Sequence, residues 1–168
     1  MSFALSAFQK IQSEHSQEFK NHYNLVIKTG THLNSSVLKL LKDNWTLDDH
    51  TLIKNTCGVF FGLWLDHAGR HSNTVQYNIH AIKLARLGDH KIKARDFAAS
   101  FRKTVKRDVK DWPAISFDFG PLTLLQGSFP LIEDQFEKAC ITRMSEFVKL
   151  CPIIDGLLAN HQKSVTPA

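Results

Sequence analysis

The segment Val59–Gly69 constrains the fold most, because it is the most apolar stretch of the chain and holds its densest cluster of aromatic residues. It is too short to cross a bilayer, which takes about 20 residues, so we expect it to be a buried element of a globular domain. The apolar residues surround the axis when the segment is drawn as a helix. The sequence therefore predicts a central helix that begins near Thr46 and is ended by Gly69.

Apolar residues also recur every three or four positions along most of the chain, the spacing that is typical of helices with one buried face. The fold class we predict is all-α, a helical bundle in a single domain over residues 1–160 with a flexible tail at 161–168. Its six or so helices are expected at 3–28, 33–42, 46–67, 73–87, 90–111 and 131–150.

The segment 112–130 interrupts this pattern. Apolar and polar residues alternate over 115–119, as in a short strand, and a connection of this length in a small domain often carries function. We expect an irregular segment with no long helix, because helix-breaking residues punctuate it: Pro113, Gly120, Pro121, Gly127 and Pro130.

The composition is that of an ordinary globular protein, with 43% hydrophobic and 22% charged residues among 168. We find no secretory signal pattern at the start and no apolar run of membrane-spanning length. Three cysteines, an odd number, favour reduced thiols over a disulfide framework. These features predict a cytoplasmic protein that does not contact membranes.

Positive charge is concentrated in one part of the chain. The net charge is +5, but residues 83–110 carry ten Lys and Arg against three Asp, which is +7. A basic face on the helix at 91–110, together with the 112–130 loop, is a candidate surface for an acidic protein partner or a nucleic acid. A solvated face is the alternative reading. The candidate partner-binding residues are Arg95, Arg102, Lys103, Lys106 and Lys110.

Histidines occupy positions that helical spacing assigns to the core. His15 and His22 lie on the apolar stripe of the first expected helix, and His80 lies on an inner face of another. Because an unpaired buried polar group costs about 1–3 kcal/mol, each must be hydrogen-bonded or bind something. With Cys57, these side chains are candidate zinc ligands, since imidazole and thiolate are the donors that Zn²⁺ prefers. Satisfied structural histidines are the alternative.

The segment Phe61–Gly69 resembles the Cys-x-x-Gly-x-Trp-Leu core of chemoreceptor zinc-binding (CZB) domains. In that family a histidine on the first helix is a zinc ligand, and His22 is similar in position. Two further family ligands, histidines one turn apart on the helix after the motif, correspond by position to Gln76 and His80. Val59 stands where the family motif has its cysteine.

The resemblance covers about residues 15–88, and it implies a sensory helical bundle with zinc as its cofactor. We find no catalytic motif, so the protein is expected not to be an enzyme. Two functions stay open at this point. One is a regulatory bundle that binds zinc and signals by helix repacking to a protein partner or within a homodimer. The other is a metal-free binding module that uses the basic helix and the 112–130 loop.

Overall fold

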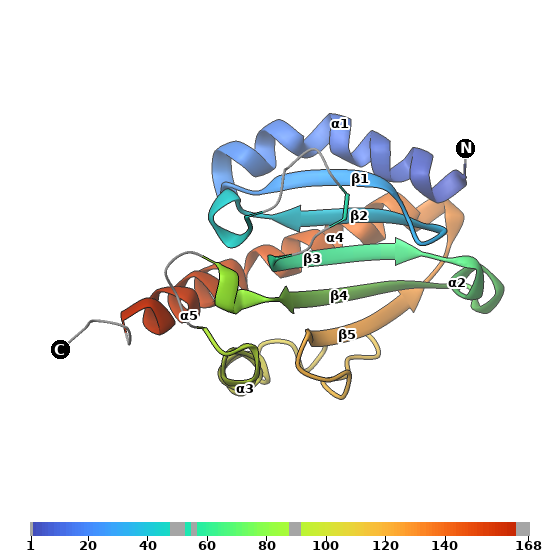
Figure 1. Cartoon of the computed structure of the whole chain (residues 1–168). Coiled ribbons are helices and arrows are strands. Elements are labelled where there is room, and N and C mark those ends of the chain that lie inside the picture. The colour runs from blue at the N-terminus through green and yellow to red at the C-terminus, as the bar shows by residue number, and fades with distance from the viewer. Residues whose placement is uncertain (1, 48–52, 55–56, 88–91, 164–168) are drawn as a thin grey trace.

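A computed structural model describes residues 2–47, 53–54, 57–87 and 92–163 (Figure 1). In this part of the chain five strands form one antiparallel sheet in the order β1-β2-β3-β4-β5, so each strand pairs with its neighbour in sequence. The strands are β1 (Val26–His32), β2 (Ser35–Leu41), β3 (Gly58–Leu65), β4 (Thr74–Ile82) and β5 (Thr123–Pro130).

Helices precede, interrupt and follow the sheet. They are α1 (Phe3–Tyr23), the short α2 (His67–Ser72), α3 (Ala94–Val105), α4 (Phe136–Val148) and α5 (Cys151–Lys163), with single 3₁₀ turns at 43–45, 84–86 and 133–135. Figure 1 shows α4 and α5 behind the sheet, α1 alongside β1, and α3 near the β4–β5 side. Among the described helices, none has the length and apolar character that a membrane span requires.

The predicted all-α fold is therefore wrong, and the fold is mixed α/β. The segments expected to be helices at 33–42, 46–67 and 73–87 contain β2, β3 and β4, although 48–52 and 55–56 lie outside the described residues. The pattern misled because β3 is buried on both faces, and such a strand has an unbroken apolar sequence that periodicity cannot distinguish from a buried helix.

Three of the expected helices form. α1, α3 and α4 fall within the predicted ranges 3–28, 90–111 and 131–150. Residues 90–91, at the start of the range predicted for α3, lie outside the described residues. The apolar side of α3 is buried, with Phe97, Ala98, Phe101 and Val105 in the core. α1 ends early because Asn24 adopts a left-handed conformation at its C-cap, after which the chain enters β1. α5 continues to Lys163, into the predicted tail, and 164–168 are not described.

The two faces of the sheet differ in what covers them. On the first face, apolar residues of neighbouring strands stand in register, as in the row Ile27, Leu40, Phe61, Ile79 and Leu125. These side chains form one core with the apolar sides of α1, α3, α4 and α5. The second face carries the alternate residues of each strand, and the candidate site lies there.

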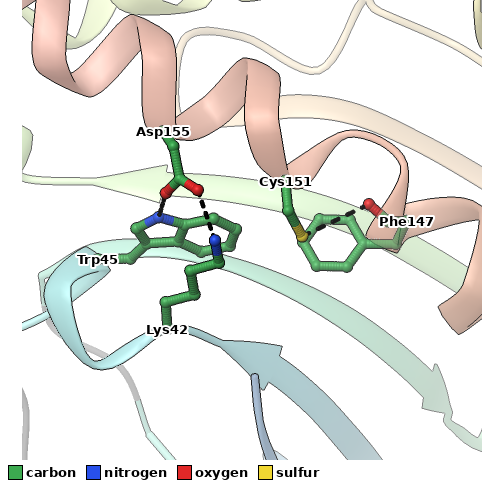
Figure 2. Close-up of polar contacts among 5 residues, drawn as sticks. All are labelled: Lys42, Trp45, Phe147, Cys151 and Asp155. Atoms are coloured by element: carbon green, nitrogen blue, oxygen red, sulfur yellow. Dashed lines mark hydrogen bonds and ion pairs between the residues drawn. The ribbon is translucent and has the colours of Figure 1, made fainter. Parts of the chain in front are cut away.

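A polar cluster holds α5 on the end of β2. The Asp155 carboxylate accepts hydrogen bonds from the Trp45 indole nitrogen, at 2.8 Å, and from the Lys42 ammonium (Figure 2). Trp45 is fully buried, so its N–H needs this partner. One turn before Asp155, the Cys151 thiol donates to the Phe147 carbonyl at 3.8 Å, and burial raises the pKa of Cys151 to about 12. This thiol therefore packs in the interior and is unreactive.

Candidate ligand-binding groove

The second face has a gap at its centre where Gly62 stands. Strand register places Gly62 in a row between Lys39 on β2 and Asn78 on β4. A Cβ built on Gly62 would have only the Asn78 amide within 4 Å, with its Oδ1 at 2.9 Å. A glycine inside a strand often marks a place where a ligand approaches the backbone. Here the Asn78 side-chain oxygen approaches the position of the missing side chain, and Gly62 is one of the residues that line a groove.

Aromatic side chains stand on both sides of this gap. Phe60 and Trp64 lie two residues before and after Gly62, so all three face the same way. At about 3.3 Å per residue, the Cα atoms of Phe60 and Trp64 are about 13 Å apart. The groove has a volume of about 310 Å³, at the lower end of what small-molecule sites usually show. Its lining residues are His32, Leu33, Ser35, Val37, Lys39, Phe60, Gly62, Trp64, Asn78, His80 and Ile82.

The β1–β2 hairpin forms one rim of the groove. Leu33 and Asn34 at its tip both have positive φ, +48° and +64°, as two-residue hairpin turns require. Asn adopts this conformation readily, but a leucine there is strained. The Leu33 side chain is also 83% exposed. A strained, exposed leucine beside a groove points to a role in contact with something outside the chain.

His80 on the opposite side of the groove is held by hydrogen bonds through both ring nitrogens. Its Nδ1–H donates to the Leu122 carbonyl at 3.3 Å, and Nδ1 also lies 3.2 Å from Thr123 Oγ1. Its Nε2 accepts a hydrogen bond from the Asn78 side-chain amide. Burial lowers the pKa of His80, the Leu122 carbonyl opposes this shift, and the Lys39 charge adds to it. Hydrogen bonds therefore fix the position of the His80 ring.

The groove has a positive electrostatic character. The Lys39 ammonium lies 4.3 Å from the centroid of the Phe60 ring and donates to the Ile53 carbonyl at 2.6 Å. Burial, then the Lys39 charge and then the Lys54 charge lower the pKa of His32. No Asp or Glu is among the described residues that line the groove. An apolar slot with a fixed cation can bind a ligand without any chemical step.

The predicted zinc site does not form, because its candidate ligands lie in different places. His80 is on the second face, whereas His22 is exposed at the end of α1, which packs on the first face. His15 is half-buried, with Nδ1 3.4 Å from Glu18 Oε2. Cys57 is buried, and its thiol donates to the Lys83 carbonyl at 3.5 Å.

No group of three or more His, Cys, Asp or Glu side chains within the described ranges could hold a metal ion. This contradicts the metal-binding and zinc predictions. The segment that carries the CZB resemblance forms β3 and the start of α2, so the central helix that the resemblance implies is not present.

The predicted basic face is present on α3 and the turn after it, but one of its members has another task. Arg102 is half-buried and donates to the carbonyls of Leu124, at 3.0 Å, and of Thr123, at 2.8 Å. It also donates to the Gly120 carbonyl. Arg102 thus ties the start of β5 and the segment before it to α3. The other four predicted residues are exposed: Arg95, Lys103, Lys106 and Lys110.

The sequence analysis singled out the segment that lines the candidate groove, but predicted it to be a buried helix. Phe60, Gly62 and Trp64 all lie in the apolar stretch Val59–Gly69, and one signal was a glycine flanked by aromatic residues at i−2 and i+2. That spacing puts all three residues on one face of a strand, whereas on a helix Phe60 and Trp64 would share one side and Gly62 would lie on the opposite side. Lys39 is added by strand pairing, which the sequence alone does not show.

Comparison with protein-family models, with curated proteins and with solved structures finds no match to this chain.

Proposed function

We propose that this protein is a non-enzymatic binding module that holds a small planar, apolar ligand in the groove above Gly62. The observation that carries the proposal is the groove of about 310 Å³ that Phe60, Gly62 and Trp64 line on the second face. Sites for small molecules are typically concave and largely apolar, with a few polar groups at defined places. Lys39, Asn78 and His80 supply those polar groups here.

The state of the polar groups supports binding over catalysis. A general base needs a ring nitrogen that is available to a substrate, and both nitrogens of His80 are engaged in hydrogen bonds. The Ser35 hydroxyl is not hydrogen-bonded to an imidazole among the described residues, so the lining lacks an activated nucleophile. We therefore keep the expectation that the protein is not an enzyme.

Titration with N-phenyl-1-naphthylamine, a neutral planar dye that fluoresces in apolar sites, tests the proposal. We expect saturable binding to one site per chain. Gly62→Leu should abolish it, because the new side chain extends into the groove that Gly62 lines. Its Cβ would lie 2.9 Å from Asn78 Oδ1, at the end of a side chain.

The matched control is Gly156→Leu. Gly156 is exposed on α5 with nothing within 4 Å of a built Cβ, so this variant should bind the dye as the wild type does. Circular dichroism would show that both variants fold. Dye binding that is absent in the wild type, or unchanged in folded Gly62→Leu, would contradict the proposal.

The exposed basic residues of α3 and the next turn support a second function, docking of an acidic protein segment. Lysines elsewhere on the surface form ion pairs, as Lys10 does with Glu137 and Lys20 with Asp43. In the described part of the chain, no ion pair is found for the four exposed basic residues Arg95, Lys103, Lys106 and Lys110. A cluster of cations that are not held in ion pairs attracts an acidic partner.

Anisotropy of a labelled polyglutamate peptide at two salt concentrations tests this second function. We expect binding that weakens steeply with salt and is lost in Lys103→Glu with Lys106→Glu. The control, Lys10→Glu with Lys20→Glu, changes the net charge equally on α1 and should retain most of the affinity. Equal loss in both variants, or tighter binding to a DNA duplex than to the peptide, would contradict an acidic protein as the partner.

The cytoplasmic location and the homodimer remain predictions. The location is supported by the cysteines, since Cys57, Cys140 and Cys151 are all buried.

A further inference from the structure

We infer that the acidic segment that docks on α3 also carries apolar side chains, which cover Phe119 and Leu122 beside the basic residues. The inference rests on the second proposed function and adds the apolar half of the partner to it. The observation behind it is a pair of exposed apolar side chains held next to cations for which no ion pair is found in the described part of the chain.

Phe119 and Leu122 are more exposed than most large apolar side chains of this protein. Phe119 is 52% exposed and Leu122 is 49% exposed, whereas the core buries most residues of these types in the described ranges. The two residues lie on either side of Gly120 and Pro121, in the short segment that leads into β5. Apolar side chains that are exposed together on a polar surface are typical of sites that bind another protein.

The backbone of this segment is fixed from two sides. On one side, the Leu122 carbonyl accepts a hydrogen bond from the Ala81 N–H of β4 at 2.9 Å. On the other side, the carbonyls of Gly120 and Thr123 accept hydrogen bonds from the Arg102 guanidinium, the latter at 2.8 Å. The two exposed side chains are therefore presented on an ordered segment, so binding does not have to order it.

The basic residues of α3 lie next to this segment. Arg95 stands seven residues before Arg102 and Lys106 four residues after it, and these spacings place all three on one face of the helix. Arg102 reaches the segment from that face, so Arg95 and Lys106 flank the contact. Figure 1 shows α3 and the segment that leads into β5 beside each other, near the β4–β5 side of the sheet.

Neither feature alone defines the partner. The cations attract any polyanion, including a nucleic acid, with an affinity that falls as salt is added. The exposed Phe119 and Leu122 side chains bury surface only against another apolar group. A protein segment with leucine or phenylalanine among its glutamates and aspartates matches both features, whereas a phosphate backbone matches only the cations.

Two labelled peptides with the same number of glutamates test the inference. One carries leucines at helical spacing among its glutamates, and in the other an alanine replaces each leucine. In anisotropy titrations the wild type should bind the leucine peptide about tenfold more tightly, because covering half-exposed apolar side chains contributes a factor of this order. Phe119→Ser with Leu122→Ser should reduce the difference to about twofold or less, since the apolar surface is then removed.

Ile132→Ser serves as the matched control. Ile132 is 48% exposed, close to the value for Leu122, but it lies beyond the other end of β5. This variant should keep the preference at about tenfold.

The comparison of the two peptides on the wild type does not depend on the folding of any variant. If the wild type binds both peptides equally well, the inference fails while the second proposed function stands. If neither peptide binds, that function fails as well. Tighter binding to anionic phospholipid vesicles than to the leucine peptide would overturn a protein segment as the partner.

Discussion

Replacing Asp155 by Ala should destabilise the protein strongly, although the residue lies on the last helix and its side chain is 37% exposed. The carboxylate is the partner of the buried Trp45 N–H at 2.8 Å, and a hydrogen bond to a charged group contributes about 1.5–3 kcal/mol. It also pairs with Lys42, whose side chain is 14% exposed, and such a partly exposed pair adds about 0.5–1 kcal/mol.

We therefore expect Asp155→Ala to lower the free energy of unfolding by about 2–4 kcal/mol. For a chain of this size the melting temperature should fall by about 5–15 °C. Urea unfolding followed by circular dichroism measures the change. The matched control is Asp155→Asn, whose amide oxygen still accepts from Trp45 and which should lose only about 1 kcal/mol. A loss below about 0.5 kcal/mol for Asp155→Ala, or equal losses for both variants, would refute this reasoning.

Three further predictions concern the sheet and the groove. Gly127→Ala should lower the free energy of unfolding by about 2–4 kcal/mol in urea unfolding. The new Cβ would lie 2.2 Å from the Tyr77 hydroxyl oxygen and 2.6 Å from the Pro113 carbonyl oxygen, which are hydrogen-bonded to each other. An unchanged free energy of unfolding would contradict the packing described. Because the pKa of His80 is lowered in the folded state, stability should be complete above the ordinary histidine pKa of about 6.5 and decline as the pH falls from there through the lowered value. His80→Gln should flatten this decline in thermal melts at a series of pH values, with the remaining slope assigned to His32; an unchanged slope would contradict the assignment. Leu33→Gly should raise the free energy of unfolding by about 0.5–1 kcal/mol, because glycine adopts the positive φ without strain. The same variant should bind the dye more weakly. A gain of stability with unchanged dye binding would show that Leu33 does not contribute to the site.

The helices that the sequence predicted correctly have one polar and one apolar face. On α3 the buried Phe97, Phe101 and Val105 recur at helical spacing while charged residues occupy the other side, so no strand pattern competes. The buried residues of α4 also recur at helical spacing, which predicts a helix: Phe136, Cys140, Met144 and Phe147.

The strands were missed because their sequences lack that contrast. β2 has Leu38 and Leu40 on one face and Val37 and Leu41 on the other. Its sequence is therefore an apolar run, which a short helix could also have. In β4 the alternation of Val75, Tyr77, Ile79 and Ala81 with polar residues is a strand signal. The intervening His80 was instead assigned to a helix face.

The prediction of a zinc site from the histidines was wrong for a related reason. His15 and His22 lie on the predicted stripe of α1, but that stripe is buried only in part. The helix buries Phe8, Ile11 and Phe19, while His22 near its C-terminal end faces solvent. His80 was predicted to be a zinc ligand, but its hydrogen-bond partners come from its own strand, from Leu122 and from Thr123, the first residue of β5. Those contacts depend on tertiary structure that periodicity does not contain.

The signal of the Trp64 indole N–H in a ¹⁵N–¹H correlation spectrum tests the central claim most directly. The chain has three tryptophans, and only Trp64 lines the groove, whereas Trp45 and Trp112 are buried with the first-face core. On addition of N-phenyl-1-naphthylamine we expect the Trp64 signal to shift in a saturable way while the other two stay in place. A shift of Trp45 or Trp112 with Trp64 unchanged, or no shift of any indole signal, would contradict a ligand site above Gly62.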